Sequence, residues 1–312
     1  YVVGLQHEAE TAVLALEDQP RPVVLRTVAA GRLGDCHWQL EQPGGERIKT
    51  ACTRAAALVA GDDVQRRELI AAGYPRDRIH LIPLGIPDLP AASLWNRDQC
   101  RSALVECNRA LYLPQRAPLA LHVGELLPDS GLETLIEAWA QVLVRHPLAC
   151  LWLVGDGPHR VPLQQLCERL RLHQRVLMPG AFDQIDDLLC SADVCAAPLA
   201  AAGPSESMLR AMAVGLPVVA VAPPGEREPA WPDGGPNDPA VVQWAGDKDA
   251  ASLATSILAV LDDPISAGRM GAAARKYVQS QHSMTQNVDR HRRLFESLCN
   301  LRSQPHTELI SP

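Results

Sequence analysis

The sequence lacks an excess of positive charge. Lys and Arg total 29 against 36 Asp and Glu, which gives the 312-residue chain a formal net charge of -7 at pH 7. A protein that binds nucleic acid through its phosphates needs a surplus of cations to neutralise them. The charge balance therefore argues against a nucleic-acid partner.

Long apolar runs and metal-binding clusters are missing as well. No uninterrupted apolar stretch approaches the roughly 20 residues that span a bilayer, and no signal peptide is visible at the start. The nine cysteines include no CxxC pair and no Cys/His cluster with zinc spacing. We expect reduced, buried thiols, no bound metal and no transmembrane segment. The expected location is cytoplasmic, with peripheral contact to the inner face of a membrane left open.

What is present is the composition of a globular protein. Hydrophobic residues make up 47% and charged residues 21% of the chain, which is long enough to bury a sizeable core. It begins Tyr1-Val2-Val3-Gly4, without Met and within a predicted strand. We interpret it as an amino-terminally truncated record or a processed product.

Strand and helix signals alternate along the whole chain, which predicts an α/β fold with doubly wound parallel sheets. Residues 1–87 form a partial domain with few strands, in which AAGRLGDCHW (29–38) is expected to be a loop. A Pro-rich linker at 83–90 leads into a second Rossmann-like domain over 88–282. A helix at 283–302 is expected to pack back on the first domain, and 303–312 to be a disordered tail.

The stretch 197–224 reads as a strand end, a small-residue loop, a short helix and a second apolar strand. Ser205 is a suitable N-cap for the helix, and Gly215 suits the left-handed position after its last turn. A helix that opens at the carboxyl end of a buried strand presents free N–H groups to an anion such as phosphate.

Three other features of the sequence are candidates for a binding or catalytic role. The loop Gly155-Asp156-Gly157-Pro158 follows a strand, but Arg160 replaces the third glycine of a dinucleotide fingerprint, which argues against a nicotinamide site. His7 and Asp35 lie near predicted strand ends and are weak candidates for a catalytic base or an acceptor ligand. The alternative is a His with a local partner and a turn Asp.

Several segments follow one another as in a known family. They are HVGEL…SGLETLIEAW, LWLVGDGPHR, VLMPGAFDQIDDLLCSADVCAAPL and GPSESMLRAMAVGLPVVAV. From about Leu119 to Leu298 the chain resembles the carboxyl half of a family 4 glycosyltransferase with GT-B architecture. RPVVLRTVAAGRLGD and the segment from Ala55 to Asp88 resemble the acceptor domain more weakly. The family's first strands and a Gly-rich loop would precede Tyr1.

The resemblance implies transfer of a sugar from a nucleotide-sugar donor to a glycan, lipid or protein acceptor, with retention of configuration. Neither a metal nor another cofactor is expected. Arg210 is added to the implied donor site because its long side chain could reach a phosphate. The residues expected at the donor diphosphate are Gly124, Gly155, Asp156, Gly157, Gly203, Pro204, Ser205, Glu206, Ser207 and Arg210, with Met178 and Gly180 on the side of the base.

The donor site departs from the family pattern at four charged positions. Glu125 and Ser130 stand where the family has a phosphate-binding Arg and Lys, and Ala202 and Arg210 stand where it has two Glu. Each lost charge-assisted contact costs on the order of 1–3 kcal/mol. A second hypothesis is therefore a catalytically impaired GT-B scaffold that acts as a binding or partner subunit. A nucleotide-sugar epimerase would share the fold, but no acid/base pair points to it.

Overall fold

The computed structural model describes the chain as two compact units. Unit 1 comprises Tyr1–Gly85 and His282–Pro312, and unit 2 comprises Ile86–Gln281. The described residues are 1–19, 21–31, 34–88, 97–114, 116–198, 204–221, 241–246 and 249–303. The predicted tail lies outside the described residues from 304 on, whereas its first residue, Ser303, ends a helix.

Unit 1 contains a parallel sheet of four strands in the order β1-β2-β3-β4. Its strands are β1 (Val2–Val3), β2 (Val24–Arg26), β3 (Ala57–Ala60) and β4 (Ile79–Leu81). Its helices are α1 (His7–Ala15), α2 (Asp35–Glu41), α3 (Gly45–Cys52), α4 (Asp63–Ala71) and α12 (Met284–Ser303), with a short 3-10 turn at Arg76–Arg78.

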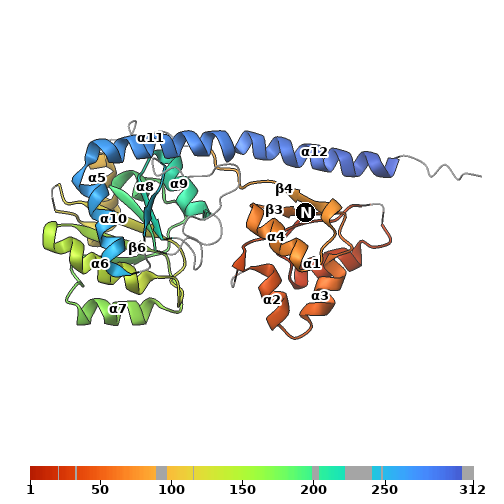
Figure 1. Ribbon diagram of the computed structural model, residues 1–312, viewed down its shortest axis with the longest axis horizontal. Coiled ribbons are helices and arrows are strands. Elements are labelled where there is room, and N and C mark those ends of the chain that lie inside the picture. Colours follow the sequence, from red (N-terminus) through yellow and green to blue (C-terminus); the bar gives the residue numbers. More distant parts are fainter. Residues whose placement is uncertain are drawn as a thin grey trace, which may run out of the picture. The chain divides into compact units, whose positions relative to one another are not determined.

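The strand order places α1, α3 and α4 on one face of this sheet, because successive right-handed crossovers run in the same direction. Leu25 and Leu58 pack there in one core cluster with Ala9 of α1, Ile48 of α3 and Leu69 of α4. On the opposite face, Val24, Ala57 and Val59 pack against Leu294 of α12, which Figure 1 shows beside β3 and β4.

Unit 2 contains a parallel sheet of six strands in the order β10-β9-β8-β5-β6-β7. The strands are β5 (Leu119–Val123), β6 (Cys150–Val154), β7 (Val176–Gly180), β8 (Val194–Ala197), β9 (Val218–Val221) and β10 (Gln243–Ala245). The helices are α5 (Arg97–Cys107), α6 (Leu132–Arg145), α7 (Arg160–Arg169), α8 (Asp186–Ser191), α9 (Glu206–Val214), α10 (Ala250–Asp262) and α11 (Pro264–Gln281), with a 3-10 turn at Arg109–Leu111.

Helices cover both faces of the sheet in unit 2, as expected for a doubly wound fold. The larger core cluster joins Leu151 and Val219 of the sheet to Leu135 of α6, Leu163 of α7 and Ile257 of α10. The helices α8 and α9 lie on the other side of the sheet (Figure 1), and α11 packs against both α9 and α10. The sheet is thus buried on both faces, which explains why its strands read as continuous apolar runs.

The predicted loop over residues 29–38 is wrong in its second half. Helix α2 begins at Asp35 and continues to Glu41, with Asp35 and Gln39 buried. The segment carries few strong helix formers, so its own residues give a weak helix signal. Its helix forms because tertiary contacts use its polar side chains: the Gln39 amide donates to Leu5 O at 2.6 Å and accepts from the Tyr74 hydroxyl at 2.9 Å.

Among the described residues, no single helix has the length and apolar character needed to cross a membrane. Helices α10 and α11 meet that criterion only when taken together, and they are bent by 100° at the break between them.

Candidate functional site

The strand order of unit 2 locates a ligand site before any side chain is considered. From β5 the chain runs outward through β6 to β7, returns to β8 on the other side of β5, and continues through β9 to β10. Ligands of open α/β sheets bind at this switch point, outside the carboxyl ends of the strands. Gly124 follows β5, and Pro204 lies between β8 and α9. Both predicted residues therefore belong to the edge of the sheet that is formed by the carboxyl ends of its strands.

The N-terminus of α9 is built as the sequence predicted. Ser205 is the N-cap, and its hydroxyl accepts from the amide of Met208 at 3.2 Å. The Ser207 hydroxyl donates to the carbonyl of Val123 at 2.8 Å and so ties α9 to the end of β5. Gly215 ends the helix in the left-handed conformation, at φ +82°. The first-turn amides of α9 therefore face the switch point, with Ser205 and Glu206 exposed.

The loops after β5 and β6 are joined by backbone hydrogen bonds. Leu126 N donates to Asp156 O at 3.0 Å, and Gly155 N donates to Gly180 O at 2.9 Å. A Cβ on Gly155 would lie 1.9 Å from Gly124 O, and one on Gly157 would lie 2.4 Å from Leu126 O. The close packing of the two loops thus requires glycine at both positions, independently of the predicted role beside a diphosphate.

The charges at the edge are arranged differently from a phosphate clamp. Glu125 is exposed directly after Gly124, and the Ser130 hydroxyl donates to Leu127 O at 2.6 Å. Arg210 donates to Asp186 Oδ1 of α8 at 2.5 Å and lies 3.9 Å from Glu206 Oε1. The predicted phosphate ligand Arg210 is therefore already paired with carboxylates. Ala202 and the predicted Gly203 lie outside the described residues.

One residue at this edge was missed from the sequence. His122 lies two residues before Gly124 in β5, and its Nδ1 donates to the carbonyl of Ala196 in β8 at 3.0 Å. Burial lowers the pKa of His122, so the neutral ring keeps its proton on Nδ1 and leaves Nε2 as an acceptor beside Gly124. An ionisable side chain inside an otherwise apolar strand was the signal that could have revealed it.

The far end of the same edge is formed by β7. Arg160, the first residue of α7, donates to the carbonyl of Met178 at 2.6 Å and lies 3.6 Å from Asp156 Oδ1. Gly180 has a φ of +98°, and a Cβ there would meet no atom within 4 Å. The two residues predicted on the base side, Met178 and Gly180, thus lie next to open space and a guanidinium. Neighbouring His159 bonds Glu133 of α6.

Comparison with known proteins gives a family match over this edge. Residues 117–263, which include β5, the GDGP loop and α9, match the family model described as glycosyl transferases group 1. This stretch of the chain is thus similar to the glycosyl transferases group 1 family.

Two curated relatives are also similar in sequence to this chain. The GDP-mannose-dependent monoacylated alpha-(1-6)-phosphatidylinositol monomannoside mannosyltransferase of Corynebacterium glutamicum is 30% identical over 167 residues, which are 51% of this chain and 42% of that protein. The N-acetyl-alpha-D-glucosaminyl L-malate synthase of Bacillus anthracis is 23% identical over 283 residues, which are 83% of this chain and 71% of that protein. The chain thus spans less than half the length of the first relative.

Solved structures establish the architecture. HepE of Anabaena in complex with UDP-glucose superimposes with a TM-score of 0.71 at 20% identity, covering 94% of this chain and 76% of HepE. Sucrose-phosphate synthase of Thermosynechococcus elongatus gives a TM-score of 0.70 at 20% identity, covering 96% and 73%. The two parallel sheets therefore have the GT-B fold that the sequence predicted.

In unit 1 of this GT-B chain, the predicted candidate Asp35 connects two strand ends. Its carboxylate accepts from the amide of Leu5 at 2.9 Å and from the amide of Val28 at 2.8 Å. Burial raises the pKa of Asp35 above its usual value, against the lowering effect of these hydrogen bonds. Because both of its oxygens accept backbone amides, the Asp35 carboxylate links the chain segments that follow β1 and β2. The other candidate, His7, is exposed and contacts the Trp38 ring edge-on at a centroid distance of 5.6 Å.

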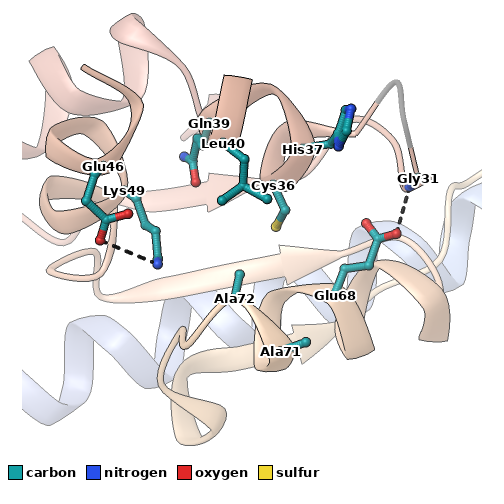
Figure 2. A pocket seen from close by; sticks show the side chains of 10 residues that line it. All are labelled: Gly31, Cys36, His37, Gln39, Leu40, Glu46, Lys49, Glu68, Ala71 and Ala72. Atoms are coloured by element: carbon teal, nitrogen blue, oxygen red, sulfur yellow. Dashed lines mark hydrogen bonds and ion pairs between the residues drawn. The ribbon is translucent and has the colours of Figure 1, made fainter. Parts of the chain in front are cut away.

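Unit 1 also contains a pocket of about 570 Å³ between α2, α3 and α4 (Figure 2). Glu68 accepts from Gly31 N at 2.7 Å, and Lys49 Nζ lies 3.6 Å from Glu46 Oε1. Burial and the nearby Glu68 raise the pKa of the Cys36 thiol to about 11, so it is not a ready nucleophile. The lining residues are Gly31, Cys36, His37, Gln39, Leu40, Glu46, Lys49, Glu68, Ala71 and Ala72.

The part of the chain that the structure describes also shows the state of its thiols and the grouping of its His, Cys, Asp and Glu side chains. All nine cysteines are free thiols, and burial raises the pKa of Cys190 and Cys195 to about 12. In the same residues, no three His, Cys, Asp or Glu side chains are grouped closely enough to hold a metal ion.

Proposed function

We propose that this chain is a family 4 glycosyltransferase that transfers a sugar from a nucleotide-sugar donor with retention of configuration. The observation that carries the proposal is the capped N-terminus of α9 at the switch point of unit 2, inside the segment that matches the glycosyltransferase model. The acceptor is a glycan, a lipid or a protein, and the reaction takes place in the cytoplasm without a metal or another cofactor.

The proposed pose follows the edge of the sheet. The diphosphate lies against the first-turn amides of α9, where the helix dipole favours negative charge. The same groups stabilise the charge that develops on the leaving diphosphate. The nucleoside extends from β5 across β6 to the open end of β7. A GDP-mannose-dependent relative and the UDP-glucose complex of HepE support a donor of this chemical class.

Calorimetric titration with UDP, GDP and ADP, followed by a donor hydrolysis assay, tests the proposal. We expect at least one diphosphate to bind, and binding and turnover to persist in EDTA. Ser207→Asp, the second residue of α9, places a carboxylate at the anion site and should weaken binding about tenfold or more. Ala251→Asp, the second residue of α10, is the matched control. Absence of binding to all three nucleotides at millimolar concentration would refute the donor site.

The impaired scaffold is the second candidate function, and a specific observation favours it. Glu125 is exposed where a diphosphate would approach, and Arg210 is already paired with Asp186. Both features weaken anion binding relative to a site with two free cations. If the chain binds a nucleotide diphosphate but neither hydrolyses nor transfers from any sugar donor, this second candidate is preferred. Measurable release of nucleotide from a sugar donor excludes it.

A further inference from the structure

At the carboxyl end of β7, two backbone carbonyl groups already accept hydrogen bonds from other parts of the chain. Met178 O already accepts from Arg160, and Gly180 O already accepts from Gly155 N. Between them, Pro179 has no N–H to donate. Two backbone carbonyls at this end of the edge are therefore already in use, and the Arg160 guanidinium lies beside them.

Helix stability does not explain Arg160. It is the first residue of α7, and a cation in the first turn of a helix opposes the helix dipole. Its side chain instead reaches the neighbouring strand, where it is held by Met178 O at 2.6 Å and by Asp156 Oδ1 at 3.6 Å. The Arg160 side chain remains 29% exposed, and a Cβ on nearby Gly180 would meet no atom within 4 Å.

From this arrangement we infer that Arg160 selects the base of the nucleotide, favouring bases that present a carbonyl oxygen over bases that present an amine at the same place. The inference rests on the proposed function, which puts the nucleoside at the end of β7. A guanidinium has five N–H donors and no acceptor, so it binds O6 and N7 of guanine or O4 of uracil. It repels the exocyclic amine that adenine and cytosine carry at the equivalent ring positions.

Two pairs of nucleotides isolate this contact. UDP and CDP differ in a 4-oxo against a 4-amino group, and IDP and ADP differ in the same way at position 6. For the full chain we expect the oxo member of each pair to bind about tenfold more tightly, the effect of one charge-assisted hydrogen bond. In Arg160→Ala the ratio within each pair should fall to about twofold or less.

Two further variants complete the design. Arg169→Ala removes an exposed Arg from the opposite end of α7 and should leave both ratios unchanged. Arg160→Lys keeps the charge and one donor without the planar fork, so it should retain diphosphate affinity while losing most of the base preference. If Arg160→Ala proves unstable in a thermal melt, the base preference of Arg160→Lys tests the proposal in its place.

The outcomes separate the two proposals. Equal weakening of all four nucleotides in Arg160→Ala, or ratios unchanged from the wild type, overturns the role of Arg160 and leaves the donor site intact. A wild-type chain that binds the members of each pair equally also overturns it. A wild-type chain that binds neither these four nucleotides nor GDP refutes the proposed function, and the base selection with it.

Discussion

At the scale of single residues, the electrostatics of the donor edge depend on a few side chains. Arg210 shows how context changes a residue's meaning, because Asp186 and Glu206 both lie within ion-pair distance of it. Asp186 comes 24 positions earlier and could not be foreseen as a partner. Glu125, by contrast, is exposed directly after Gly124.

Replacing Glu125 by Arg should strengthen nucleotide binding. The change removes an exposed anion beside the proposed diphosphate and adds a cation, so we expect about tenfold tighter binding of UDP or GDP by calorimetry. Glu168→Arg, in the last turn of α7, makes the same change in net charge away from the edge and should have little effect. Equal affinity in Glu125→Arg and the wild type would place the diphosphate elsewhere.

Replacing Asp35 by Asn should destabilise unit 1. Both carboxylate oxygens accept backbone amides, and an Asn would point its NH₂ group at one of them, at a cost of about 2 kcal/mol. Urea denaturation measures the loss of unfolding free energy.

The pH dependence of this loss has a defined sign. Burial raises the folded pKa of Asp35 above 3.8, so the wild type loses stability as the pH rises from 3.8 through that raised value. Asn does not titrate, so the difference between the two proteins should shrink over that interval. A difference that grows over that interval would contradict the expected direction.

At the scale of elements, the edge of unit 2 is rigid because its loops are hydrogen-bonded to one another. The loops after β5 and β6 share backbone bonds, and α9 is joined to β5 through Ser207. The strands β5 and β6 are short apolar runs that each precede a Gly, a local pattern typical of buried parallel strands. The sequence could not predict which loops touch, because that depends on the strand order.

Two glycines of this edge should respond differently to alanine. Gly155→Ala forces a Cβ to 1.9 Å from Gly124 O at a φ of +140°, so we expect a loss of about 3 kcal/mol or more. Gly180→Ala meets open space and carries only the backbone strain of φ +98°, about 1–2 kcal/mol. Urea denaturation of both variants gives the comparison, and equal losses would contradict the loop packing described above.

At the scale of the whole molecule, the two units differ in how their sheets are built. Unit 2 has six strands with helices on both faces, whereas the four strands of unit 1 have α1, α3 and α4 on one face and α12 on the other. All residues of the proposed donor edge belong to unit 2. Donor binding should therefore be a property of unit 2 alone.

A fragment of residues 86–281 tests this. It retains the six-stranded sheet and its core, so we expect cooperative urea unfolding and a Kd for UDP or GDP within about threefold of the full chain. A folded fragment with affinity reduced tenfold or more would show that unit 1 contributes to the donor site.

The sequence by itself determined the fold class, most strands and helices of unit 2, and the capped helix after Ser205, because these follow from local periodicity and capping chemistry. Only the tertiary structure decided the chemistry of the edge. Asp186 faces Arg210, Arg160 reaches Met178, and His122 bonds Ala196 across the sheet. The reason is physical: a side chain's charge and free donors depend on neighbours from distant segments, and those neighbours are set by strand order.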